Sequence, residues 1–459
     1  TAIFEAGTWL PTEGRRSNAD SDDWRWTLRS TANRPLLRLT GEATGPVSRD
    51  EVSSSADRPS RTVSEGRVAF MAGDGSFGNG GTHQLFMLDR AGLDGDVSVF
   101  RANLGDTQVP GANTSIAVSA GMEHQRAFGG ETRVLVSYDS HPELINEKGV
   151  GLQVLRAATS EKIVLGDVFV VDAGTLLTAE HMLGNRVTSA PYLRAAFHAS
   201  PEVALEYRLA TDPELQRDED ADDLGPPDET LSDAEGRPLP HKALHQEVVA
   251  IETREKMVLS VAVYHDSIPV EGVQGGGSVL PAGATDQPVL SDAATQTFRV
   301  ALHGTSSTGM RLAWQQSFNP VLSACVESEF GTAMAGTGPG LRLDTLGQTV
   351  KPRMSGAIAA GVQLTGRRTG TTMKARYRWQ PAGTLTQIDE FDARPGDAFL
   401  GISLKQRLWS GHRLKGVNAV LEATNLLAEG YQPIAGSDGD TFFLAQVPRA
   451  LQAGLAFSF

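Results

Sequence analysis

Three stretches of the sequence carry residue types that could do chemistry, and the first is rich in glycine. "GDGSFG" places Gly73, Gly75 and Gly78 in the G-x-G-x-x-G spacing that binds dinucleotide phosphates. That chemistry needs a helix to follow, with its N-terminus facing the pyrophosphate. The residues that follow, "NGGTHQLFMLDR", are glycines and then a strand-like run, so we expect a loop here and no cofactor.

The other two stretches combine histidine with carboxylates. "HKALHQE" offers His241, His245 and Glu247, which are ligand types of a metal site, and "HDS" at 265–267 holds the residue types of a hydrolytic triad. Both stretches have the pattern of strands. On a strand, residues four apart are too distant to share one ion, and adjacent side chains point to opposite faces. We therefore expect no metal site, no catalytic residues and no enzymatic activity.

Composition argues against several further functions. The 41 basic and 55 acidic side chains give a net charge of -14, which argues against binding to nucleic acid. Cys325 is the only cysteine, so there is no disulfide framework, and its surroundings predict a small side chain packed on a strand. The acidic run "DEDADD" at 218–223 lacks the spacing of a calcium loop and is predicted to be a solvated surface.

Alternation with a period of two is the dominant pattern in the chain, and it predicts strands. In "TTMKARYRWQ" at 371–380, an apolar side with tyrosine and tryptophan lies opposite a side made almost entirely of cations. "DWRWTLRS" near the N-terminus repeats this arrangement, and "FLGISLKQRL" at 399–408 extends it. The cations on these three strands are Arg25, Arg29, Lys374, Arg376, Arg378, Lys405 and Arg407.

The spacing between strands predicts how these side chains are positioned. Tight connections such as "TREK" (253–256) alternate with long polar ones such as 211–242, and further links are expected at 159–161 (short) and 43–82 (long). Such spacing indicates a transmembrane antiparallel β-barrel of roughly 18–22 strands, with long extracellular loops and short periplasmic turns. In that fold the apolar sides face lipid and the seven cations face a polar lumen. Alternation alone also fits a soluble antiparallel sheet with one wet face.

The C-terminus favours the barrel. "LQAGLAFSF" carries an unbroken apolar row that ends at Phe459, which would be an aggregation-prone edge in a soluble sheet but is simply the last strand of a closed barrel. The chain here resembles outer-membrane β-barrels, whose members typically end in such a strand with a final phenylalanine. The resemblance implies that Phe457 and Phe459 form the signal read by the barrel-assembly machinery. "VNAVLEATNLLAEGY" (417–431), with Asn425 and Leu426, is similar to the penultimate strand of TonB-dependent receptors.

These observations predict one all-β domain over residues 1–459, integral to the cell outer membrane and in contact with its lipid. The first expected strand, "AIFEAGTWL", begins at Ala2, and no plug domain is recognisable within the chain, so an upstream plug or another subunit is an expected partner. The predicted function is passage or uptake of a small solute, and the inward cations favour an anionic one. Two alternatives stay open: a structural or interaction barrel whose long loops bind a partner at the cell surface, and a soluble secreted all-β protein.

Overall fold

The structure is a computed structural model. It describes residues 63–73, 81–91, 97–106, 115–126, 130–145, 151–166, 168–212, 231–233, 236–239, 242–276, 289–292, 297–336, 340–366, 368–389, 391, 399–409, 416–436, 440–445 and 449–458. Several sequence predictions lie outside these residues. They are the expected strand "AIFEAGTWL", the expected strand "DWRWTLRS" with Arg25 and Arg29, the acidic run 218–223, His241 and Phe459.

Strands make up nearly all of the described chain. In chain order the elements are β1 (Val63–Gly73), β2 (Gly81–Ala91), β3 (Val97–Asp106), β4 (Ser115–Gln125), β5 (Gly130–Ile145), β6 (Gly151–Leu165), β7 (Phe169–His181), β8 (Asn185–His198), β9 (Val203–Ala210), β10 (Leu244–Arg254), β11 (Met257–Gly276), β12 (Val289–Asp292), β13 (Thr297–Ser317), β14 (Leu322–Gly336), η6 (Leu343–Thr345), α2 (Leu346–Thr349), β15 (Val350–Gly366), β16 (Thr371–Trp379), β17 (Phe399–Trp409), β18 (Gly416–Thr424), β19 (Tyr431–Ala435), β20 (Thr441–Ala445) and β21 (Ala450–Ser458).

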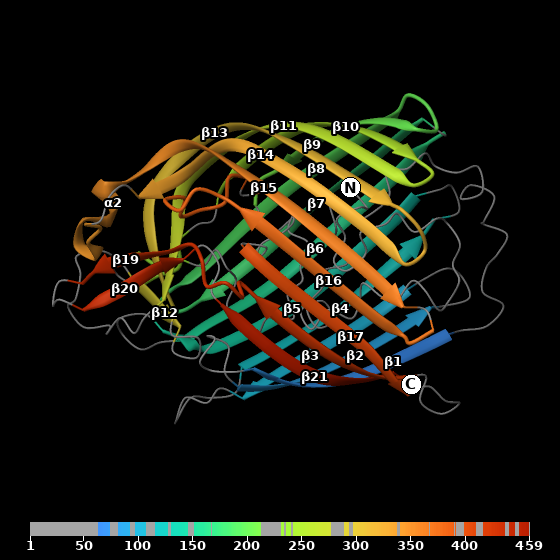
Figure 1. The fold of residues 1–459 in the computed structure, drawn as a ribbon, viewed down its shortest axis with the longest axis horizontal. Helices are drawn as coiled ribbons and strands as arrows, with labels where there is room; N and C mark the ends of the chain where they lie inside the picture. Colours follow the sequence, from blue (N-terminus) through green and yellow to red (C-terminus); the bar gives the residue numbers. More distant parts are fainter. Residues whose placement is uncertain are drawn as a thin grey trace.

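Eighteen of the described strands close into one antiparallel barrel (Figure 1). Each strand from β1 to β11 pairs with the next along the chain, β11 pairs with β13, and the order then continues to β18. The last strand, β21, pairs on one side with β18 and on the other with β1, from Arg67 opposite Ser458 to Gly73 opposite Gln452. This closure confirms the predicted all-β barrel, and its strand number falls within the predicted range.

The two faces of the wall have opposite character, as the alternation predicted. On β10, His245 and Glu247 are buried while Leu244 and Val248 are exposed. On β16, Met373, Tyr377 and Trp379 are likewise exposed on the outside of the barrel. A soluble protein buries its large apolar side chains, whereas a membrane barrel turns them toward lipid and keeps a polar interior. The distribution therefore indicates a transmembrane barrel. None of the described helices has the length and hydrophobicity to cross a membrane.

Short turns connect the strands at one end of the barrel, and their sequences explain their shape. Between β13 and β14, the Asn319 side chain accepts hydrogen bonds from the backbone N–H groups of Val321 (2.8 Å) and Leu322 (2.9 Å). Between β8 and β9, Ser200 Oγ accepts a bond from the Val203 N–H (3.1 Å). Asparagine and serine favour such turns because their side chains bond to nearby backbone. Short turns of the predicted kind thus connect β8 with β9 and β13 with β14.

Two of the predicted connections are wrong. Residues 159–161 lie in the middle of β6, and β1 occupies part of the stretch expected to be the long loop 43–82. In β6 the misleading signal is the polar sequence "TSEK", in which Ser160 is buried and donates a hydrogen bond to Asp172 of β7 (3.1 Å). Thr159 and Glu161 lie on the opposite face from Ser160, so polar residues also interrupt the outer apolar row by which this strand would be recognised.

The end with the long connections carries a small apolar core of its own. Strand β12 pairs with β13 and β5, the β19–β20 hairpin touches the end of β11, and η6 and α2 lead into β15. Figure 1 shows α2, β12, β19 and β20 gathered at this end. Buried side chains from these elements form one cluster, which includes Phe298, Met334, Leu343, Phe442 and Leu444. Strands β11 and β13 reach this core because they run for 20 and 21 residues.

Candidate functional site

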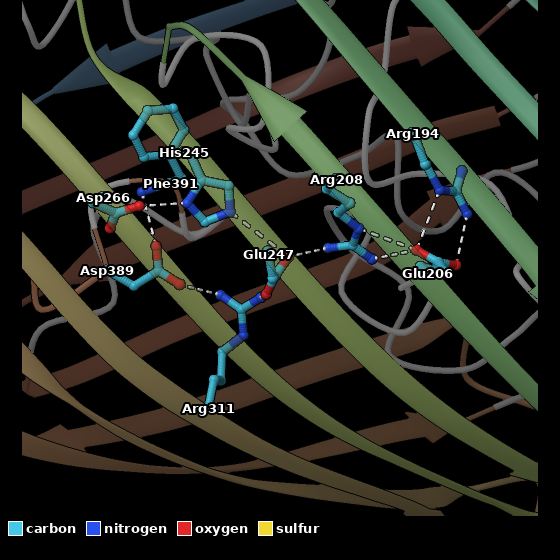
Figure 2. Close-up of polar contacts among 9 residues, drawn as sticks. All are labelled: Arg194, Glu206, Arg208, His245, Glu247, Asp266, Arg311, Asp389 and Phe391. Atoms are coloured by element: carbon cyan, nitrogen blue, oxygen red, sulfur yellow. Dashed lines mark hydrogen bonds and ion pairs between the residues drawn. The ribbon is translucent and has the colours of Figure 1, made fainter.

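A line of ion pairs crosses the inner wall of the barrel from β8 to β10 (Figure 2). Arg194 donates two hydrogen bonds to Glu206, at 3.0 and 3.2 Å. Glu206 also accepts a bond from Arg208 (2.8 Å), and Arg208 Nη1 reaches Glu247 on β10 (3.0 Å). Because inward-facing positions recur at every second residue, neighbouring antiparallel strands place these groups side by side.

The line continues through Arg311 of β13. Its Nη2 donates to Glu247 Oε1 (2.6 Å) and its Nη1 donates to Asp389 Oδ2 (2.7 Å). Glu206, Arg208 and Glu247 are at most 1% exposed, so the charges can be accommodated only because opposite signs alternate along the line.

Asp389 belongs to a segment that leaves the wall and enters the barrel. This inward segment, residues 381–389 and 391, follows β16 and has Leu385, Ile388 and Phe391 buried. Its backbone is attached at several points: the Leu385 N–H donates to the carbonyl of Met334 (2.8 Å), and the Tyr264 hydroxyl donates to the carbonyl of Ile388 (3.1 Å). The inward segment therefore occupies part of the interior that the wall encloses.

A histidine and two aspartates meet where the inward segment contacts β10 and β11. His245 lies directly opposite Asp266 in the β10–β11 register, and its Nδ1 is 2.5 Å from Asp266 Oδ1. Phe391 stacks on the imidazole with ring centroids 4.6 Å apart. Side-chain ligand atoms of His245, Asp266 and Asp389 all lie within 4.8 Å of one another. These three residues are at most 1% exposed.

The cations singled out from the sequence lie elsewhere on the wall. Arg376 and Arg378 of β16 donate to Glu327 and Glu329 of β14, each at 2.7 Å. The remaining members of the described set are Lys374 and Lys405, which are half-buried, and Arg407, which is exposed beside a register shift in β17. An effect of these cations on a solute stays a prediction.

The His245 cluster was missed because its residues were considered one stretch at a time. The expectation that adjacent residues of "HDS" point apart is confirmed, since Asp266 is buried while His265 is exposed. The predicted turn at "TREK", 253–256, nevertheless implies that residue 245 lies opposite residue 266. Asp389 had no comparable signal in the sequence, because it comes from a connection between strands. Cys325 is buried on β14, as predicted.

The closed antiparallel sheet, its apolar outside and its charged inside together define an outer-membrane type of transmembrane β-barrel. No family model and no curated protein matches the chain.

Solved structures similar to the chain include a mutant of the ferric enterobactin receptor PfeA from Pseudomonas aeruginosa, at 9% identity and a TM-score of 0.40, covering 86% of this chain and 80% of that one. The siderophore receptor PirA from Pseudomonas aeruginosa has 9% identity and a TM-score of 0.38, covering 93% and 81%. The alcaligin outer-membrane receptor FauA from Bordetella pertussis has 11% identity and a TM-score of 0.35, covering 86% and 76%. Because the sequence identities and TM-scores are this low, the assignment of the chain to a β-barrel fold rests on its own strand pairing.

Proposed function

We propose that the protein is an outer-membrane β-barrel through which a small polar solute crosses the membrane, with the inward segment narrowing the path. The observation that carries this proposal is the buried charged lining of the closed barrel. Glu206, Arg208 and Glu247 face inward while apolar side chains on the same strands face outward. A lining of charged groups is what a polar solute needs along its path, because such groups can replace part of its hydration.

The size of the barrel supports the same conclusion. Barrels of about eight strands have interiors filled by side chains, whereas those of about 16 to 18 strands enclose an aqueous channel. Eighteen strands therefore leave more room than side chains from the wall can occupy. The inward segment, fixed by Tyr264, Met334 and Arg311, is a chain segment in that space that can limit the size of the solute.

The cations of β16 do not form an unbalanced ring. Arg376 and Arg378 are balanced by Glu327 and Glu329, and the line of ion pairs from Arg194 alternates in sign. A lining of alternating charges favours a polar solute without a strong preference for one sign, whereas an unbalanced ring of cations selects anions. Removing the two glutamates should expose the preference for anions that the cationic strand was predicted to confer.

Conductance across a planar bilayer tests the proposal. The wild-type barrel should give discrete conductance steps, and replacing residues 382–391 by a short Gly-Ser linker should enlarge them. In a salt gradient, Glu327→Gln combined with Glu329→Gln should move the reversal potential toward anion selectivity, because the two arginines lose their counter-charges.

The matched control is Arg254→Ala at the end of β10, beside the short β10–β11 turn. Its side chain is 63% exposed and pairs only with Glu252 among the described residues, so conductance and selectivity should stay at wild-type values. Folded wild-type barrel that conducts neither before nor after the linker replacement would count against solute passage and favour a scaffold that binds a partner through its loops.

A further inference from the structure

We propose that His245, Asp266 and Asp389 bind a divalent first-row transition-metal ion such as Zn²⁺, which ties the inward segment to the barrel wall. The site joins three separate pieces of chain: β10, β11 and the inward segment (Figure 2). The candidate ligand atoms lie within 4.8 Å of one another. This proposal concerns the fixing of the inward segment and does not depend on solute passage.

The polar contacts of Asp266 leave one of its buried oxygens unsatisfied. Its carboxylate is 1% exposed, and among the described residues its hydrogen-bond partner is His245. Asp266 Oδ2 is buried without a hydrogen-bond partner in the described chain, and so is His245 Nε2. A buried carboxylate is costly unless a cation compensates it, and an unsatisfied buried oxygen adds to that cost. A metal ion beside Asp266 would remove both costs.

The neighbours of the cluster are arranged as the surroundings of a metal site usually are. Ligating histidines commonly direct their second ring nitrogen toward a carboxylate. Here Nδ1 faces the aspartates, and Nε2 lies 3.8 Å from Glu247 Oε2. Asp389 is held in place by Arg311 at one oxygen and by the Phe391 N–H at the other (3.0 Å). A carboxylate offers about four lone-pair positions, so both bonds leave Asp389 able to coordinate.

The ligand types select the class of ion. Imidazole nitrogen suits zinc and its neighbours in the first transition row, while Ca²⁺ and Mg²⁺ prefer ligand sets made only of oxygen. Zn²⁺ bonds of roughly 2.0–2.2 Å in a tetrahedral site keep two ligand atoms about 3.3–3.6 Å apart. Binding therefore requires the contact between His245 and Asp266, which is 2.5 Å, to open by about 1 Å.

The test measures bound metal in protein that carries no polyhistidine tag. Barrel refolded in detergent with Zn²⁺ and then dialysed against metal-free buffer should retain one equivalent per chain by mass spectrometry. His245→Gln and Asp389→Asn should each lose it. Glu247→Gln should weaken binding by about 10–100-fold, because Glu247 lies beside the second ring nitrogen of His245 and orients the ring. Excess Mg²⁺ should not displace the ion.

His265→Gln is the matched control, because His265 sits next to Asp266 on β11 but is exposed on the opposite face. It should retain the metal. Asp389 is outside the barrel strands, so its variant should fold, which heat-modifiable migration in a gel can verify. X-ray absorption of wild-type protein loaded with Co²⁺ should show one imidazole with oxygen ligands, a result that needs no variant. Wild-type barrel without bound metal, or equal retention by Asp389→Asn and His265→Gln, would overturn the proposal in favour of a protonated histidine between two aspartates.

Discussion

Glu206 illustrates at the scale of single residues how the barrel interior tolerates charge. It is fully buried and accepts hydrogen bonds from Arg194 on β8 and from Arg208 on its own strand, β9. Removing one partner of a buried ion pair costs more than the pair contributes, since the remaining charges are left without compensation. The local sequence "EVALEYRLA" shows that this glutamate points inward, but it does not show that Arg194 will meet it.

Glu206→Gln should lower the free energy of unfolding by about 3–5 kcal/mol, because Arg194 and Arg208 lose the charge that compensates them. Urea titration of barrel reconstituted in detergent micelles, followed by tryptophan fluorescence, measures the change. Glu252→Gln is the control: its pair with Arg254 is at the surface and should contribute less than about 1 kcal/mol. Equal effects of the two substitutions would show that water in the interior screens the Glu206 pairs.

At the scale of elements, Tyr264 connects three strands to the inward segment. Its ring lies over Gly309, which is directly opposite it on β13, and its hydroxyl approaches Gly331 on β14. The same hydroxyl donates to the carbonyl of Ile388. Two glycines thus leave the space that lets a large aromatic side chain from β11 cross its neighbours and fix a segment inside the barrel.

Gly309→Ala should therefore destabilise the protein. The new Cβ would lie 2.3 Å from the Tyr264 ring, so the ring must move and the hydroxyl loses its position at Ile388. Overpacking of this kind typically costs about 1–3 kcal/mol, measured here as a lower urea midpoint.

Gly276→Ala is the matched control for this substitution, because no atom lies within 4 Å of the added Cβ at the end of β11. A loss of stability at Gly276 as large as that at Gly309 would mean that glycine acts through backbone freedom and not through the space it leaves for Tyr264.

At the scale of the whole molecule, the barrel depends on its last strand. Strand β21 pairs with β18 on one side and β1 on the other, so the cylinder closes only when this strand is in place. Phe457 lies opposite Val68 and Val417, and its ring contacts Phe70 edge-on with centroids 6.3 Å apart. Closure removes the free edges that an open sheet of this size would expose.

Deleting residues 457–459 should abolish accumulation in the outer membrane, since closure is weakened and the predicted assembly signal at Phe457 and Phe459 is lost. Immunoblots of membrane fractions, with and without heating before electrophoresis, measure both amount and folding. Phe318→Ser, in a short turn where the ring is 52% exposed, is the control and should accumulate normally. Normal levels of the truncated chain would show that neither closure nor insertion requires these residues.

Much of the fold was determined by local sequence. Period-two alternation is a property of each strand alone, so rows such as Met373, Tyr377 and Trp379 already specify the outward face. Turn residues such as Asn319 and the apolar last strand likewise act over a few positions, and together with the alternation they predict an antiparallel barrel.

Only the tertiary structure decided which inward groups meet. Alternation places Glu247 and Asp266 on the inner face, but whether Arg208, Arg311 or a histidine lies within reach depends on the register between strands and on the curvature of the closed wall. Asp389 reaches the site because a connection between strands turns into the barrel, a path fixed by contacts with residues distant in the chain. Strand β6 shows where the local pattern fails: Ser160 bonds to Asp172 on the inner face, and Thr159 and Glu161 interrupt the apolar row on the outer face, so pairing with its neighbours alone reveals this strand.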